Sequence, residues 1–121
     1  MIRAWLLSAA IGGFLSVVVG AMAEHLGVGD RSAELLRTGA LYGIVHAAAL
    51  IAVSAIGETS DRPDPALIIS GWGLAGGMLL FSLSLFGSAL LGIKQLGFIT
   101  PLGGLGLLVG WAALALHALR R

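Results

Sequence analysis

Cysteine and asparagine are both absent from this chain, and charged residues fill only 11% of its 121 positions. Without cysteine there is no disulfide, no thiolate nucleophile and no cysteine metal site. A soluble domain carries about 25% charged residues, so this chain has too few charges to cover a surface that faces water. The net charge of +1 includes no basic run, which excludes a nucleic-acid-binding surface.

Long apolar runs occupy most of the chain instead. The run over residues 66–91 contains no charged residue, and it exceeds the ~20 residues that a helix needs to cross a bilayer core. Comparable runs cover residues 4–23, 38–56 and 101–119, separated by short polar connections. We therefore expect an all-α integral membrane protein with four transmembrane helices in an up-down-up-down bundle, forming a single domain over residues 1–121.

The first apolar run has a second interpretation. Its last residues, Ala21-Met22-Ala23, have the small-x-small pattern of a signal-peptidase site, which is typical of a cleaved signal peptide. The run is about twenty residues long, however, and exceeds the usual apolar core of a signal peptide. We therefore interpret residues 4–23 as the first transmembrane helix.

Small residues recur at steps of four in the expected spans. Such a stripe lets two helix backbones approach closely, so it indicates a packing face within this chain or against another copy. Incidental spacing is the alternative, because the chain contains 19 glycines. The expected packing positions are Ser8, Gly12, Ser16, Gly20, Gly39, Gly43, Gly73, Gly77, Gly103, Gly104, Gly106 and Gly110.

His46 is the one strongly polar, ionisable side chain that we expect deep within an apolar run. A polar group without a partner in hydrocarbon costs several kcal/mol, so we expect His46 to face the interior, against the first or the third span. Tyr42 lies one turn away on a neighbouring face. Ser82 and Ser84 lie inside the third span, where they can bond to their own helix or serve as partners of His46.

Glu24 and His25, at the end of the first span, extend these residues into one candidate polar cluster. A proton or cation relay from His25 through Tyr42 to His46 is one interpretation, because intramembrane ionisable groups mark such paths. A structural cluster that ties the first two spans together is the interpretation that we favour. Because His25, His46 and His117 lie at three different depths, we expect no haem, no metal and no other cofactor.

Four groups of motifs resemble those of a known family. They are Gly20-Ala21 with His25, Tyr42 with His46, Gly71-Trp72 with Phe81-Ser82, and Thr100-Pro101 with Gly103-Gly104 and Gly110-Trp111. In this order and spacing, the chain is similar to the YgdD-type small bacterial inner-membrane proteins. That family has no known function (DUF 423), and its eukaryotic relatives are called transmembrane protein 256. The resemblance covers nearly the whole chain and implies a four-helix integral membrane protein, without implying an activity.

Catalysis has little support in this sequence. No nucleophile–base pair and no carboxylate pair lies within a span, and the loops are too short to build a soluble pocket, so we expect that the protein is not an enzyme. The function that we favour is a non-catalytic structural or accessory membrane component. An oligomeric small-ion or proton channel or transporter that uses His46 is the alternative. Against it, the chain has no carboxylate deep in a span, as small multidrug exporters need, and no asparagine, as small fluoride channels use.

The expected partners are the lipid bilayer and either further copies of the chain or other subunits of a larger membrane complex. Orientation depends on a small difference in basic residues. The side with both termini has Arg3, Arg62, Arg120 and Arg121, and the other side has Arg31, Arg37 and Lys94. Because cytoplasmic segments carry the excess of lysine and arginine, we expect cytoplasmic termini in the cell inner membrane.

Overall fold

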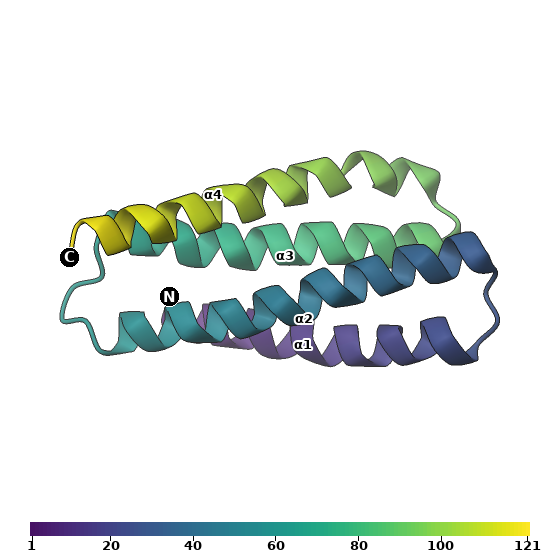
Figure 1. Ribbon diagram of the computed structural model, residues 1–121, viewed down its shortest axis with the longest axis horizontal. Helices are drawn as coiled ribbons and strands as arrows, with labels where there is room; N and C mark the ends of the chain where they lie inside the picture. Colours follow the sequence, from purple (N-terminus) through teal and green to yellow (C-terminus); the bar gives the residue numbers. More distant parts are fainter.

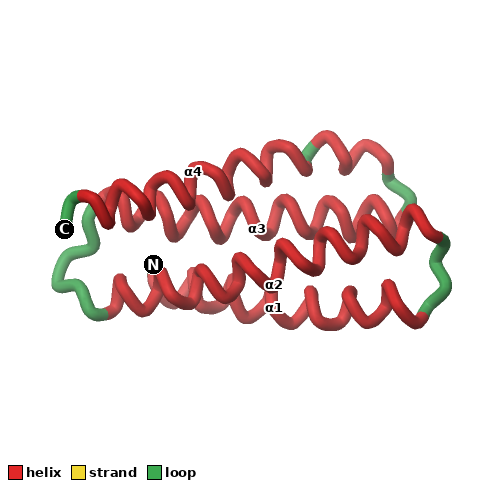
Figure 2. Tube along the Cα trace, viewed as in Figure 1, coloured by secondary structure: helices red, strands yellow, loops and turns green.

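A computed structural model describes residues 1–121, and nearly all of them are helical (Figures 1 and 2). The long helices are α1 (Ile2–His25), α2 (Asp30–Glu58), α3 (Pro65–Leu91) and α4 (Thr100–Leu119), and a short 3-10 helix, η1, spans Lys94–Phe98. The four long segments are long and apolar enough to cross a membrane. The expected all-α class with four transmembrane helices is confirmed.

Successive helices run antiparallel, and both termini lie at the same end of the bundle (Figure 1). The four helices do not form a closed square, however. Helix α3 packs against α1, α2 and α4, whereas the backbone of α4 approaches only α3 and the adjacent η1. Helix α3 is therefore the central helix, and α2 and α4 flank it without contact between their own backbones.

Turn residues set the ends of the helices. Gly27 and Gly29 have φ values of +60° and +94°, which glycine adopts without steric cost, and they separate α1 from α2. Helix α2 then begins at Asp30, well before the expected span, because the polar segment ahead of the membrane is also helical. Asp64 caps α3 by accepting the backbone N–H of Leu67 at 2.8 Å.

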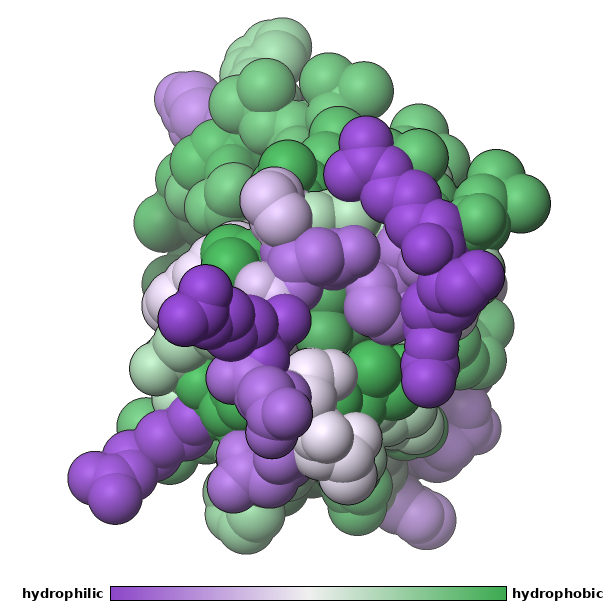
Figure 3. Space-filling view, turned by 90° about the vertical axis from the view of Figure 1, so that its left-hand side faces the viewer, coloured by the Kyte–Doolittle hydropathy of each residue, from purple (hydrophilic) through white to green (hydrophobic).

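The surface has the pattern of a protein that crosses a bilayer. Hydrophilic side chains gather across the end that carries the termini, and hydrophobic side chains surround them (Figure 3). Along the flanks of the bundle the exposed side chains are large and apolar, such as Phe14, Val17 and Leu108. An apolar surface of this extent needs lipid or another protein to cover it.

Glycine lets the backbones of α3 and α4 touch. A Cβ atom at Gly77 would lie 2.5 Å from the backbone nitrogen of Leu107 and 2.8 Å from the carbonyl oxygen of Gly103. Gly73 meets the backbone of Gly106 and Gly110 in the same way. Because the neighbouring atoms are backbone, a side chain here cannot be accommodated by a change of rotamer.

The remaining small residues of the expected stripes differ in their surroundings. Four of them contact other helices of the same chain: Gly12 faces Met78, Gly20 faces Ala40, Gly43 faces Ser16, and Gly39 faces Phe86. Gly104 is different, because its nearest neighbour would be Phe81 Cδ2 at 3.9 Å, which is ordinary contact. Ser8 is only half-buried. The stripes thus serve mainly intramolecular packing, and Gly104 borders open space.

Candidate functional site

A groove of about 570 Å³ lies over α3 between α2 and α4. It forms because the backbones of α2 and α4 do not meet. Tyr42 and His46 of α2 line one side, Phe81 of α3 forms part of the floor, and Gly104 and Trp111 of α4 line the other side together with leucine side chains. The groove, which we call the α2–α4 groove, is therefore mostly apolar, with one histidine in its wall.

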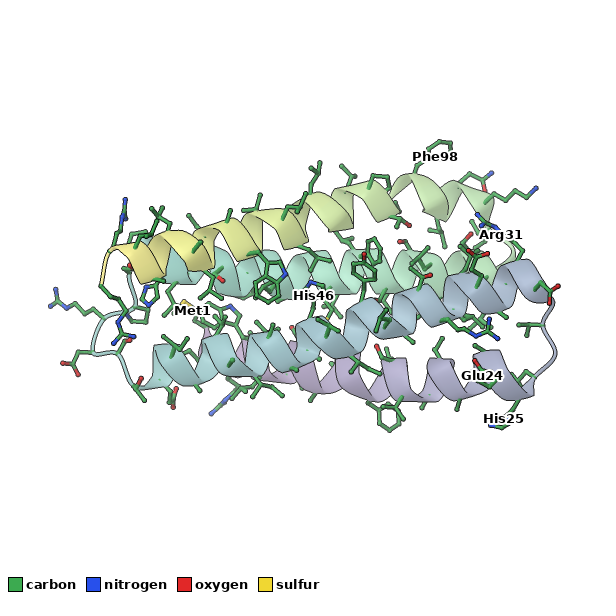
Figure 4. The ribbon with its side chains drawn as sticks, in the orientation of Figure 1. Met1, Glu24, His25, Arg31, His46 and Phe98 are labelled. Carbon is green, nitrogen blue, oxygen red and sulfur yellow. The ribbon has the colours of Figure 1, made fainter.

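His46 uses both of its ring nitrogens inside the chain. Its Nδ1 lies 2.7 Å from the carbonyl oxygen of Tyr42, and its Nε2 accepts the indole N–H of Trp111 at 3.0 Å. A carbonyl only accepts and an indole only donates, so the ring carries its proton on Nδ1 and is neutral. The side chain is only 5% exposed. His46, midway along the bundle in Figure 4, thus joins α2 to α4 across the gap between their backbones.

Aromatic rings surround this contact. The rings of Tyr42 and His46 are stacked, with centroids 5.8 Å apart and planes 8° apart. Phe81 lies 4.6 Å from Tyr42, and Trp111 meets His46 nearly edge-on at 67°. Because aromatic pairs contribute about 0.5–1.5 kcal/mol beyond their buried area, the rings hold the histidine in place.

Of the two roles expected for Ser82 and Ser84, the bond to His46 is not found, because the side-chain partner of His46 is Trp111. The interior position holds, but the partner lies on the fourth helix instead of the first or third. Ser82 donates to the carbonyl oxygen of Gly39 on α2 at 2.9 Å. Ser84 donates to Phe81 O at 2.8 Å, and its hydroxyl lies 2.6 Å from that of Thr100. The two serines therefore join helices elsewhere and make no hydrogen bond to the histidine.

The structure does not bring Glu24 and His25 to His46. Glu24 accepts from Arg37 Nε at 2.6 Å, which forms an exposed ion pair between α1 and α2. His25 lies at the end of the bundle opposite Met1, and its side chain points away from the bundle (Figure 4). A relay from His25 to His46 therefore has no geometric support. No group of three or more histidine and carboxylate side chains is placed to hold a metal ion.

A second polar contact, which the sequence analysis missed, joins the start of α3 to the end of α4. Asp64 Oδ1 lies 2.9 Å from His117 Nδ1 and also accepts the N–H of Leu67. The hydrogen bond from Leu67 and then the one from His117 lower the pKa of the Asp64 carboxyl. A capping aspartate on one helix and a histidine in the last turn of the next, antiparallel helix is the signal that identifies such a pair.

Folding lowers the pKa of the Asp64 carboxyl. Its contribution to stability is therefore fully present above the ordinary aspartate pKa, and it is lost as the pH falls through the lower pKa of the folded state. We expect the unfolding temperature of the wild type in detergent to drop as the pH falls below about 5, toward and through the lowered pKa of Asp64. The Asp64→Asn variant should show a smaller drop and a lower stability at neutral pH. Asp61→Asn, in the same loop, is the control and should keep the wild-type profile. Identical profiles for wild type and Asp64→Asn would contradict this assignment.

The fold and the site together define a class: a small four-helix integral membrane protein whose intramembrane histidine is paired within the chain. A family model described as a protein of unknown function (DUF423) matches residues 19–104. The chain belongs to this family, and the resemblance to YgdD-type proteins is confirmed.

Relatives from several bacteria match over nearly their whole length. A UPF0382 membrane protein of Haemophilus influenzae is 35% identical and covers 92% of this chain and 90% of its own. The UPF0382 inner membrane protein YgdD of Escherichia coli is 33% identical, covering 98% of this chain and 91% of its own. The UPF0382 membrane protein YwdK of Bacillus subtilis is 29% identical over 98% of both chains. No solved structure matches this chain.

Proposed function

We propose that the protein is a non-catalytic structural or accessory component of the cell inner membrane. It acts as a single transmembrane domain over residues 1–121, in a homo-oligomer or as a subunit of a larger complex, with its termini in the cytoplasm. The observation that carries this proposal is the pairing of His46, whose two ring nitrogens are both occupied by Tyr42 and Trp111 of the same chain. A histidine whose two ring nitrogens are both bonded within the chain stabilises the packing of α2 and α4.

The other hydroxyl groups that bond within the spans support the same conclusion. Ser54 donates to the carbonyl oxygen of Leu50 in its own helix, and Ser82 donates to Gly39 in the neighbouring one. A transport path needs a continuous set of polar groups that can exchange partners with the passing ion. The α2–α4 groove is instead lined largely by apolar side chains. The inner-membrane placement is supported by the Escherichia coli relative, which is named an inner membrane protein.

A flux measurement separates this proposal from a His46-dependent channel. The wild type and the His46→Ala variant are reconstituted into liposomes, and proton and potassium flux are compared with protein-free vesicles. We expect both proteins to leave the vesicles as tight as the controls. A wild-type flux that His46→Ala abolishes would contradict the proposal and establish the channel.

The assembly part of the proposal has its own test. The protein is purified from membranes in a mild detergent, and the mass of the intact particle is determined. A homo-oligomer, or a second polypeptide present at a fixed ratio, is the expected result. A monomer that retains no partner, also after cross-linking in intact membranes, would contradict it.

A further inference from the structure

A second hollow, of about 600 Å³, lies at the end of the bundle opposite the termini. Its lining includes two cations, Arg31 and Lys94, and three hydroxyl residues, Ser32, Ser88 and Thr100, but no carboxylate. Arg31 comes from the start of α2 (Figure 4), and Lys94 comes from η1. The hollow therefore offers two positive charges and several hydrogen-bond donors where the bundle meets the membrane surface.

The two cations are free to bind an anion. Arg31 lies 3.9 Å from Glu34, but both side chains are largely exposed, and such a pair is weak. Lys94 forms no ion pair within the chain. Arg37 differs from both, because its Nε is bound to Glu24 at 2.6 Å. The lining of the hollow thus carries one cation with a weak ion pair and one with none, and no carboxylate of its own.

This hollow adjoins the α2–α4 groove at Pro101, which lines both. From Thr100 to Trp111, α4 rises by about 16 Å, which is close to half of the ~30 Å hydrocarbon core. The adjoining hollow and groove, which together we call the cleft, reach from the membrane surface to about its middle. Its outer part is cationic and polar, its inner part is apolar, and the His46–Trp111 contact lies along its inner wall.

We propose that this cleft binds one molecule of an anionic phospholipid. The phosphate lies between Arg31 and Lys94 and accepts hydrogen bonds from them, and one acyl chain follows the groove down to Trp111. A guanidinium suits this role, because it binds phosphate through paired N–H groups. The proposal goes beyond the proposed function and does not rest on it, since a structural component and a channel are equally able to bind such a lipid.

The test is native mass spectrometry of the purified full-length protein titrated with phosphatidylglycerol and, separately, with phosphatidylethanolamine of the same acyl chains. We expect one bound phosphatidylglycerol and a preference of about thirtyfold over phosphatidylethanolamine, as two cations at a membrane surface provide. The Arg31→Gln/Lys94→Gln double variant should lose this preference. The control Arg62→Gln/Arg121→Gln, which removes two charges from the opposite end, should keep it.

A second variant tests the acyl-chain part. Gly104→Leu places a side chain in the groove, where only Phe81 lies near its Cβ position. We expect this change to weaken phosphatidylglycerol binding about tenfold, by analogy with the filling of an apolar pocket, without lowering the unfolding temperature. Gly76→Leu is the matched control, because Gly76 has no neighbour within 4 Å and does not line the groove.

Four results of the binding measurements would overturn the proposal. The first is equal binding of the two lipids. The second and third are undiminished phosphatidylglycerol binding by the Arg31→Gln/Lys94→Gln variant and by Gly104→Leu. The fourth is displacement of phosphatidylglycerol by inorganic phosphate. The last would show a site for a free anion. A dimer whose formation expels the lipid from wild type but not from Gly104→Leu would also overturn it, because the groove would then be an interface between copies.

Discussion

Gly77→Ala is expected to destabilise the protein by about 3 kcal/mol, the upper part of the range for overpacking. The added methyl group would meet the backbone of Leu107 and Gly103, with distances of 2.5 and 2.8 Å from its Cβ position. Since no rotamer change can relieve a clash with backbone, α4 has to move away from α3. That movement also separates Trp111 from His46, so the loss includes their hydrogen bond.

The neighbouring glycine is a matched control. Gly76 has open space around its Cβ position, so Gly76→Ala is expected to stabilise the helix by up to about 1 kcal/mol. Unfolding of both variants in mixed micelles, with increasing sodium dodecyl sulfate and helix content as the signal, gives the difference. If Gly77→Ala were as stable as Gly76→Ala, the close approach of α3 and α4 would be wrong.

Trp5→Ala is expected to cost about 3 kcal/mol, because it empties a large site in the core. Trp5 is 0% exposed, and its ring covers Gly71 of α3, where any side chain would collide with it. Its indole N–H is buried without a partner, and removal of this unsatisfied group offsets part of the loss. Trp5→Phe, which keeps much of the ring and removes the N–H, should therefore cost clearly less.

Trp72 provides the comparison for this prediction. Its ring meets that of Trp5 at 83°, with centroids 6.2 Å apart, but it is 49% exposed toward the lipid. Lipid chains can fill the space that Trp72→Ala leaves, so this variant should cost at most about 2 kcal/mol. The same unfolding assay applies. A loss for Trp72→Ala that equals or exceeds that for Trp5→Ala would contradict the proposed core.

The fold was predictable because its determinants are local. Apolar length alone identifies the four spans, since hydrocarbon admits only helices whose backbone bonds are satisfied internally. The glycines after α1 and the aspartate before α3 mark helix ends by their own chemistry. The open arrangement of α4 was not predictable in this way. It depends on which glycine-containing helix faces pack together. A stripe such as Gly73 and Gly77 predicts close packing, but it does not identify the helix that packs there.

The candidate site was harder to predict for the same reason. His46 was expected against the first or third span, because it needs a polar partner in hydrocarbon and the serines of the third span were candidates. The glycines of α3 and α4 instead bring α4 close enough for a long indole side chain to reach across the gap. Helices α2 and α4 run in the same direction, and His46 and Trp111 lie in their middle parts. An indole donor at the depth of a buried histidine was therefore the signal that was missed.

Three polar contacts of the bundle each join two different helices, and this links the stability of the bundle to the proposed function. The His46–Trp111 contact joins α2 to α4, Ser82 joins α3 to α2, and the Asp64 pair joins α3 to α4. Helix α4 packs closely against α3, but its backbone does not approach α2, so the His46–Trp111 contact spans the remaining gap. We infer that these contacts fix the position of α4 and thereby the width of the α2–α4 groove.

Nitrogen NMR of the His46 ring in lipid bilayers at neutral pH tests this account most directly. The expected spectrum shows a neutral ring with its proton on Nδ1 and an unprotonated Nε2 that accepts a hydrogen bond. In the Trp111→Phe variant, the Nε2 signal should shift and the Nδ1 signal should remain. A ring protonated on Nε2, or an Nε2 signal that Trp111→Phe leaves unchanged, would contradict the claim that His46 braces α2 against α4.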